Sequence, residues 1–439
     1  MPRLLLLLPT TTYRAEAFLE ASRKLKLDVT VGSEQADPVT GNHPPDLLAL
    51  EFHDPDKAAH AVVEFARTYP IHAVIGVDDH TTVLASVLAG ALGLPHNTVQ
   101  SVSAARNKYH MRERLRAHAV PVPRFSLFSI DDDPQTLIAP SPSPLPGREK
   151  AKVRGGIGFP CVVKPLILSA SCGVIRADDR AAFVAAFRRV AALLMRLGLA
   201  ETDEAARHIL VEEFVPGREV ALEGLLTNGE LRVLALFDKP DPLDGPFFEE
   251  TLYVTPSRLP AGTQADIASC AARAASALGL REGPIHGELR VNSDGIWVIE
   301  VAARTIGGRC SRTLRFTAGM SLEELILRHA LRMDLPPLDG RQEPAGVMML
   351  PIPRAGILKA VHGEAEAMRI PGIQELAITA QPGQELVPLP EGTRYLGFLI
   401  ARGDTAEAVE SALREAHRKL EFVITPTPAE PGRSRAMSF

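Results

Sequence analysis

The sequence reads IHGELRV at residues 285–291, NSDG at residues 292–295 and IWVIEV at residues 296–301. Two segments of alternating apolar residues, separated by a turn that ends in glycine, predict a β-hairpin. A three-residue loop, Ser293-Asp294-Gly295, would place Gly295 where a positive φ is required. The loop length sets the pairing of every residue in the two strands, so this hairpin determines which side chains face each other.

That register pairs Leu289 with Ile299 and sets Glu288 directly opposite Glu300. The other face of the hairpin then carries apolar side chains, namely Ile285, Leu289, Val291, Trp297, Ile299 and Val301. Because two facing carboxylates repel each other, a divalent cation between them is expected, and oxygen ligands favour Mg²⁺ or Mn²⁺ over zinc. Two alternatives remain: a loop of another length that leaves both glutamates in solvent, or a protonated acid pair.

A second motif, FPCVVKP at residues 159–165, predicts a buried strand that ends at Lys164. The loop SASCG follows at residues 169–173. Such small residues let backbone N–H groups approach phosphate oxygens, while a lysine supplies a positive charge. The chain contains no Walker A sequence, and a plain surface loop is the simpler interpretation of this motif taken alone.

A third motif, ILVEEFVPGREV at residues 209–220, predicts a strand, a Pro-Gly turn and the start of another strand. Such a hinge can present backbone groups and one carboxylate to an adenine edge, and a second carboxylate to ribose hydroxyls. An ordinary strand–turn–strand is the alternative.

The order of the motifs narrows these interpretations. Asn107-Lys108 in a helix, VVKP with its small-residue loop, EEFVPGRE, HGE and EVAAR follow one another along the chain. This set resembles the ATP-grasp superfamily over nearly the whole chain, and the EVAAR form is most similar to the L-amino acid ligases. The resemblance implies an α/β fold with an N-terminal Rossmann-like lobe, a central lobe and a C-terminal α+β lobe, with ATP gripped between two sheets.

The resemblance also implies roles for individual residues. The implied contacts to ATP come from Lys108, Lys164, Ser171, Gly173, Glu212, Glu213, Val215 and Glu219. Lys108 and Lys164 would meet the phosphates, Glu212 the adenine amino group and Glu219 the ribose.

For the metal, the resemblance implies Glu288 and Glu300, and for the acyl phosphate it implies Arg304. Ala302 departs from the family pattern, because many members have a metal-binding Asn there. One ligand of a second magnesium ion is therefore missing, which is typical of the L-amino acid ligase subgroup.

The substrate side is expected from residues 237–253 and from the turn after Arg304. Glu250 would receive an amino group, and Lys239 or Arg309 a carboxylate. His286 lies on the same face as Glu288 and would donate to a phosphoryl or acyl oxygen. The turn Gly307-Gly308-Arg309 would let the backbone approach the acyl phosphate. Solvated loop charges and a structural histidine are the alternatives.

The resemblance implies an enzyme, an ATP-dependent carboxylate–amine ligase. It would form an acyl phosphate from a small carboxylate such as an amino acid, join it to an amine, and release ADP and phosphate. Two other functions stay open: a carboxylase-like protein that makes carboxyphosphate from bicarbonate, and a non-catalytic ATP-binding module.

Composition sets outer bounds. The net charge of −5 gives no general attraction to nucleic acid or anionic membrane. The four cysteines have neither zinc-ligand nor disulfide-framework spacing, which favours free thiols and a cytoplasmic location. The apolar run Leu4–Leu8 is short for a signal peptide and predicts a strand. Small-molecule partners are expected, and a homodimer remains open.

Alternating strands and helices in the first hundred or so residues predict a parallel sheet. We therefore expect a Rossmann-like domain at 1–103, a central lobe at 104–220, a catalytic lobe at 221–335, a C-terminal lobe at 336–425 and a flexible tail at 426–439. Within the central lobe, one helix is expected at Ala104–Ala117. The Pro-rich stretch 131–158 is expected to be a flexible surface insertion or linker.

Overall fold

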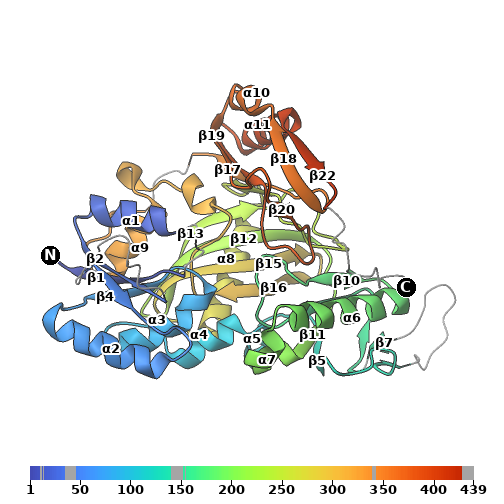
Figure 1. Ribbon diagram of the computed structural model, residues 1–439, viewed down its shortest axis with the longest axis horizontal. Helices are drawn as coiled ribbons and strands as arrows, with labels where there is room; N and C mark the ends of the chain where they lie inside the picture. Colours follow the sequence, from blue (N-terminus) through green and yellow to red (C-terminus); the bar gives the residue numbers. More distant parts are fainter. Residues whose placement is uncertain are drawn as a thin grey trace.

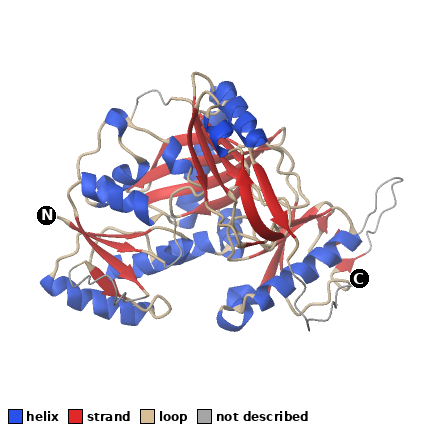
Figure 2. Cartoon of the chain, turned by 45° about the horizontal axis from the view of Figure 1, so that its top comes forward, coloured by secondary structure: helices blue, strands red, loops and turns tan. Residues whose placement is uncertain are grey.

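The computed structural model describes residues 1–9, 12, 14–34, 46–139, 152–153, 155–338 and 343–427. Figure 1 shows the N-terminal part in blue and the central part in green on two sides of a large sheet, with the C-terminal part in red above it. Strands run through the middle of the molecule and most helices lie outside them (Figure 2). Among the described residues, no helix has both the length and the apolar character needed to cross a membrane.

The N-terminal lobe is a parallel sheet of strand order β3-β2-β1-β4. Its elements are β1 (Arg3–Leu7), α1 (Ala15–Lys24), β2 (Asp28–Ser33), β3 (Leu47–Ala49), α2 (Pro55–Thr68), β4 (Ala73–Gly76) and α3 (Asp79–Ala91). Leu4 to Leu7 of β1 are fully buried, because helices cover both faces of the sheet. The prediction of a strand at this leucine run and of a parallel sheet is therefore confirmed.

The single helix expected at Ala104–Ala117 is in fact two helices, α4 (Val99–Arg106) and α5 (Lys108–Ala117). Asn107 separates them with φ −96° and ψ 111°, and its side chain accepts hydrogen bonds from the N–H groups of Tyr109 and His110. Asparagine is a favoured N-cap residue, and this capping role was missed in the sequence. The break places Lys108 at the first position of a new helix.

The central lobe is a four-stranded sheet of order β10-β9-β11-β5, covered by α6 (Arg180–Arg196). Its strands are β5 (Phe125–Ser129), β9 (Cys161–Pro165), β10 (Ile175–Ala177) and β11 (His208–Glu213), and α7 (Leu199–Thr202) follows α6. Strand β9 is buried over its whole length, as the VVKP motif predicts.

The described ends of the stretch 131–158 are not a surface linker. They form the small sheet β6 (Ile138–Ala139), β7 (Lys152–Val153) and β8 (Ile157–Gly158). Leu137, Val153 and Ile157 are buried and pack in the core of the central lobe, so their apolar side chains override the Pro-rich composition around them. Residues 140–151 and 154, and residues 428–439 of the tail, lie outside the described part of the chain.

The largest sheet has eight antiparallel strands in the order β16-β15-β12-β13-β14-β17-β21-β19. These are β12 (Arg218–Thr227), β13 (Glu230–Asp238), β14 (Leu252–Thr255), β15 (Gly283–Asn292), β16 (Gly295–Ala302), β17 (Ala345–Leu350), β19 (Ile373–Ile378) and β21 (Gly397–Arg402). Because β14 pairs with β17, the sheet runs across the domain boundary expected at residue 335.

Helices and a small sheet complete these lobes. They are α8 (Ala261–Leu278), α9 (Leu322–Ala330), α10 (Glu364–Met368) and α11 (Ala406–Lys419), with β18 (Gly356–His362), β20 (Glu385–Leu386) and β22 (Glu421–Thr425). Helix α9 contacts α1, so it joins the catalytic part to the N-terminal lobe.

In the hairpin β15–β16, Glu288 and Glu300 face each other as predicted, although the strands pair in a different register near the loop. The loop has two residues, so Asn292 pairs with Gly295 and Val291 with Ile296, one residue away from the prediction. A β-bulge between Glu288 and Leu289 then shifts the register back and sets Glu288 opposite Glu300. Val298 consequently joins Val301, a predicted core residue, in the core on β16, and the predicted core positions Trp297 and Ile299 are only half-buried.

Candidate active site

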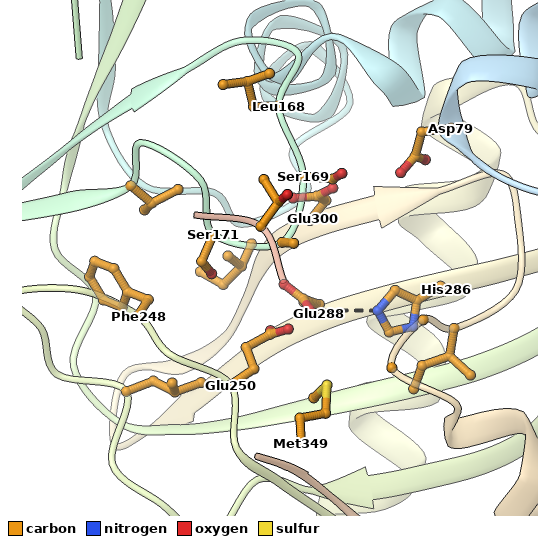
Figure 3. Close-up of a pocket in the computed structure, with 18 of the residues that line it drawn as sticks. Asp79, Leu168, Ser169, Ser171, Phe248, Glu250, His286, Glu288, Glu300 and Met349 are labelled. Atoms are coloured by element: carbon orange, nitrogen blue, oxygen red, sulfur yellow. Dashed lines mark ion pairs between the residues drawn. The ribbon is translucent and has the colours of Figure 1, made fainter. Parts of the chain in front are cut away.

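A cavity of about 670 Å³ lies where the N-terminal, central, catalytic and C-terminal lobes meet. The N-terminal lobe contributes Asp79, the central lobe Ser169 to Ser171, and the C-terminal lobe Tyr395. Figure 3 shows Glu250, Glu288 and His286 projecting into the same space, with Glu300 and Ser169 above Glu288 in this view and Asp79 at the upper right. The cavity therefore collects side chains that are hundreds of residues apart in the sequence.

Two buried lysines line the central-lobe side. The Lys108 ammonium donates to the Leu168 carbonyl at 2.8 Å and lies 3.4 Å from Glu300, and the Lys108 N–H donates to the Leu166 carbonyl. Lys164, at the end of β9, lies 2.5 Å from Glu212. Burial lowers the pKa of Lys164, and the charge of Glu212 partly offsets that effect.

Glu212 is enclosed by two cations. Arg112 Nε donates to its carboxylate at 2.6 Å, and Lys164 contacts the other oxygen. Burial raises the pKa of Glu212, but Arg112 and Lys164 together hold it below its ordinary value. Glu212 faces the cavity already charged and already paired.

The two other predicted ATP contacts of the hinge, Glu213 and Val215, have partners within the protein. The Glu213 side chain makes a two-point ion pair with Arg124 at 2.6 and 2.9 Å on the surface, so its carboxylate already has a partner within the protein. The Val215 carbonyl accepts a hydrogen bond from Arg290 Nη1 at 2.7 Å. Arg290 also donates to Glu219 at 2.8 Å and thereby connects the hinge to β15.

Three carboxylates surround the buried Lys239 ammonium. It lies 2.8 Å from Glu219, 2.5 Å from Glu250 and 3.0 Å from Glu288. One oxygen from each of these glutamates lies within 4.8 Å of the others. Burial by itself would lower the pKa of Lys239, but the three carboxylates raise it well above its usual range.

The glutamates around Lys239 lie close enough together to shift each other's pKa values. Burial and the charge of Glu288 raise the pKa of Glu250. Burial would also raise the pKa of Glu288, but Lys239 and His286 hold it well below the ordinary value. The three oxygens around Lys239 are already neutralised by its ammonium, and carboxylate donors such as Glu288 and Glu300 suit Mg²⁺ or Mn²⁺ better than zinc. Glu300 faces the same cavity on the next strand, toward Lys108.

His286 lies between two acids. Its Nε2 is 3.5 Å from Glu288, and its Nδ1 is 3.8 Å from the buried Glu223. The Ile306 N–H donates to Glu223 at 2.9 Å. Burial lowers the pKa of His286 and raises that of Glu223 well above its ordinary value. The histidine therefore lines the cavity between two carboxylates.

Arg304 is oriented by the N-terminal lobe. Its Nε lies 2.8 Å from Asp79, and its Nη1 donates to the Thr305 carbonyl. Arg14 Nη1 also donates to Thr305, to both its hydroxyl oxygen and its carbonyl oxygen. Asp79 starts α3, directly after β4, so the carboxyl end of the parallel sheet faces the cavity.

The Asp79–Arg304 pair predicts a pH-dependent contribution to stability. Burial would raise the pKa of Asp79, but Arg304 lowers it from 3.8 to about 2. A folded-state pKa below the unfolded value stabilises the fold at neutral pH, here by about 2 kcal/mol, and this contribution disappears as the pH falls through that interval. Asp79→Asn should therefore lower the free energy of unfolding at pH 7 and lose this effect toward pH 2, as measured by urea denaturation.

Asp266→Asn, at an exposed position of α8, is the matched control and should cost little at any pH. A destabilisation by Asp79→Asn that stays constant from pH 7 to acid would contradict the ionic origin of the effect.

Part of the small-residue loop, residues 169–173, is already hydrogen-bonded to another lobe. Ser169, Ala170 and Ser171 line the cavity, and Ser171 has a φ of 55°. The Gly173 N–H, expected at phosphate, instead donates to the Pro390 carbonyl of the C-terminal lobe at 2.7 Å. That glycine is also tightly packed, because an added Cβ would lie 3.1 Å from Pro165 and 3.2 Å from Leu193.

The turn after Arg304 contains two residues with positive φ, and its arginine is already paired. Gly308 has a φ of 59° and Arg309 a φ of 57°. Gly307 and Gly308 both line the cavity. Arg309 donates to Glu375 at 3.0 Å and lies over the Phe398 ring. Both cations expected to bind a substrate carboxylate, Lys239 and Arg309, therefore have carboxylate partners within the protein.

Several residues of the site were missed in the sequence, and two had a detectable signal. Arg112 lies four residues after Lys108 on α5, hence on the same helix face. Arg290 alternates with Glu288 on β15 and so shares its face. Asp79 and Glu223 carry no comparable local signal, because Asp79 reaches Arg304 from another lobe and Glu223 reaches His286 only through the pairing of β12 with β15.

Comparison with known protein families gives three matches along the chain. An ATP-grasp N-terminal domain matches residues 19–96, an ATP-grasp domain residues 157–313, and an L-amino acid ligase C-terminal domain 2 residues 348–425. The chain belongs to the ATP-grasp superfamily. The EVAAR segment and the C-terminal domain match agree on the L-amino acid ligase type.

Named relatives support this placement of the ATP-grasp chain. The crystal structure of an L-amino acid ligase from Bacillus licheniformis is similar with a TM-score of 0.76, at 26% identity, over 97% of this chain and 99% of that chain. Alanine–anticapsin ligase of Bacillus subtilis is 26% identical over 64% of this chain and 60% of that protein. Dapdiamide A synthase of Enterobacter agglomerans is 27% identical over 55% of this chain and 52% of that protein.

The match thus spans about 60% of the length of the curated alanine–anticapsin ligase. The expected α/β ATP-grasp fold, with N-terminal, central and C-terminal lobes, is confirmed by the L-amino acid ligase structure.

Proposed function

We propose that this ATP-grasp chain is an ATP-dependent carboxylate–amine ligase that makes an acyl phosphate and joins it to an amine. The observation that carries the proposal is the single cavity in which Lys108 and Lys164 face Glu288, Glu300 and Arg304. A phosphate-binding side and a metal-binding side lie in one space, next to an arginine held in place by Asp79.

The nucleotide end is the side of the cavity formed by the hinge and the two lysines. Lys108 and Lys164 are buried cations that would contact phosphate oxygens. Glu212 already accepts from Arg112 and Lys164, and a carboxylate has about four acceptor positions, so an adenine amino group is a further donor it can accommodate. Glu219 would accept from the ribose hydroxyls.

The metal end consists of Glu288 and Glu300, with Glu250 beside them. Magnesium held there would draw negative charge from the phosphate oxygens during transfer. Ala302 offers no ligand, so these glutamates would carry the protein's share of the coordination.

The chemistry follows from the groups around the cavity. A carboxylate oxygen of the first substrate attacks the γ-phosphorus of ATP, the bond to the β–γ bridging oxygen breaks, and ADP leaves. The nitrogen of the second substrate attacks the acyl carbon and loses a proton, while the C–O bond to phosphate breaks and releases inorganic phosphate. Lys164 and Arg304 stabilise the charge that moves onto the oxygens, and His286 donates to a phosphoryl or acyl oxygen.

We propose an amino acid as the carboxylate substrate, because the relatives that share this domain arrangement carry names of amino acid ligases. Ile306, Met349 and Phe398 add apolar side chains to the lining of the same cavity as Glu250, which suits a substrate with both a side chain and an amino group. The apolar lining and the carboxylate together favour a free amino acid over bicarbonate.

The deciding experiment is a phosphate-release screen of amino acid pairs with ATP and Mg²⁺, with products identified by mass spectrometry. We expect ADP and phosphate to form only when both an acid and an amine are present. ADP release driven by bicarbonate alone would favour a carboxylase-like reaction, and AMP with pyrophosphate would reject the acyl-phosphate scheme. Absence of turnover across the panel would favour a non-catalytic ATP-binding module.

Glu219→Gln should mainly weaken ATP binding. The substitution removes a charged hydrogen-bond partner of the ribose, which corresponds to roughly a tenfold to hundredfold rise in KM for ATP. It also removes a carboxylate from Lys239 and Arg290, so the melting temperature should fall. Steady-state kinetics with varied ATP and a thermal melt test both effects. Glu230→Gln, exposed at the start of β13, is the matched control, and an unchanged KM for Glu219→Gln would reject the ribose role.

A further inference from the structure

The loop Ser169–Gly173 of the central lobe is tied to a segment of the C-terminal lobe. We call this segment, residues 388–395 between β20 and β21, the C-terminal strap. The Gly173 N–H donates to the Pro390 carbonyl at 2.7 Å, and the buried Cys172 thiol lies 3.7 Å from the Glu391 carbonyl. The phosphate side of the cavity is therefore bonded to a lobe that carries none of the ATP motifs.

An ion pair reinforces these backbone contacts. Arg189 of α6 donates to Glu391 through Nε at 2.5 Å and through Nη2 at 2.8 Å. Two parallel N–H···O bonds fix the relative orientation of both groups, which a single contact would not do. The Arg189 guanidinium also lies over the Phe247 ring, 5.2 Å from its centre, so the segment before Glu250 touches the same arginine.

Both connected segments reach into the cavity. On the central-lobe side, Ser171 lines the cavity two residues before Gly173. On the strap, Thr393, Arg394 and Tyr395 line it a few residues after Glu391. The contacts between the strap and the loop therefore lie only a few residues along the chain from the cavity on both sides.

We propose that Arg189 and Glu391 are positioning residues that hold the loop Ser169–Gly173 closed and couple its closure to occupancy of the C-terminal side of the cavity. The inference rests on the proposed ligase function. A closed loop excludes water from the phosphoryl end and protects the acyl phosphate until the amine arrives. When the pair is broken, the loop opens more often and water competes with the amine.

The first experiment measures the loop without any reaction. Hydrogen exchange of the peptide covering residues 169–175 is followed in the full chain for wild type, Arg189→Gln and Glu391→Gln. Both variants should exchange faster, by roughly twofold to fivefold, which is the range for one partly exposed ion pair. Arg188→Gln, exposed on the same helix one residue away, is the control and should exchange like wild type. Exchange equal to that of the control would overturn the proposal.

The second experiment measures coupling. The ratio of ADP formed to ligation product should rise roughly twofold to fivefold in Arg189→Gln and Glu391→Gln, with a smaller change in KM for ATP. The charge-reversed single variants Arg189→Glu and Glu391→Arg should also uncouple, and the combined variant should recover most of the coupling. Equal ratios in all variants, or losses that simply add in the combined variant, would overturn the proposal.

The two experiments separate the inference from the function on which it rests. If wild type makes no ADP in response to an acid and an amine, the proposed function fails, and the exchange data still decide whether the pair holds the loop. If wild type ligates but the variants keep its coupling ratio, the function stands and the positioning role fails.

Discussion

The Glu300→Gln variant is expected to lose turnover by at least about 10²–10³-fold, because it removes a negative charge that the metal and phosphates require. Glutamine keeps the shape of the side chain, and Glu300 is a quarter exposed in the cavity with Lys108 as its ion-pair partner at 3.4 Å. The fold should therefore tolerate the change. Steady-state turnover at saturating ATP and Mg²⁺ measures the effect, and a thermal melt checks the fold.

Glu300 is the better test than Glu288, because Glu288 also neutralises the buried Lys239 and contacts His286. Loss of Glu288 would mix catalysis with the stability of the acid cluster. Glu407→Gln, exposed in the first turn of α11, is the matched control and should keep wild-type turnover. Retained activity in Glu300→Gln would reject the metal assignment.

The second large effect is expected from Arg304. Arg304→Ala should lower kcat by about 10²–10³-fold, since it removes a charged donor aimed at the oxygens that gain charge in the transition state. Arg304→Lys should recover only part of this loss. The arginine pairs with Asp79 through Nε and still has N–H groups left for the substrate, whereas a lysine ammonium is a single point charge and cannot make both contacts. KM for ATP should change far less than kcat, because the two lysines and the hinge remain intact.

The kinetic split is the decisive readout for Arg304. If Arg304→Ala instead raises KM for ATP and leaves kcat unchanged, the arginine acts at the nucleotide and not at the acyl phosphate. Arg418→Lys, exposed in the last turn of α11, is the matched control and should leave both parameters unchanged.

The N-terminal lobe has a direct part in the site. Asp79 and Arg14 hold the segment Arg304-Thr305, and α9 packs on α1. The arginine that would contact the acyl phosphate is thus positioned by a lobe that contributes neither lysine nor metal ligand. Changes in the N-terminal lobe are therefore expected to alter kcat more than ATP affinity.

Local patterns in the sequence were enough to predict the strands that carry the site. The buried strand ending at Lys164, the parallel leucine strand at the N-terminus and the hairpin of Glu288 and Glu300 all follow from periodicity and turn residues. The ordered motifs added the superfamily and hence the three-lobed fold. The helix break at Asn107 was missed, because a capping asparagine inside an apolar pattern reads as continuous helix.

The hairpin shows how a correct pairing arose from an incorrect register. Turn chemistry predicted a three-residue loop, and the chain uses two residues with a bulge before Leu289. Only the packing of β15 between β12 and β16 decides where such a bulge lies. Because of the same bulge, Val298 occupies the core position that was predicted for Ile299.

By itself the sequence determined which elements form and which residue types their ends present, because hydrophobic periodicity, caps and turn residues act over a few neighbours. Tertiary structure alone decided the partners: Arg112 on Glu212, Lys239 among three glutamates, Asp79 on Arg304 and Arg189 on Glu391. Each pair joins residues from 11 to 225 positions apart, distances over which no local propensity acts. Burial and charge in the folded lobes select these contacts, and they turn a set of motifs into one site.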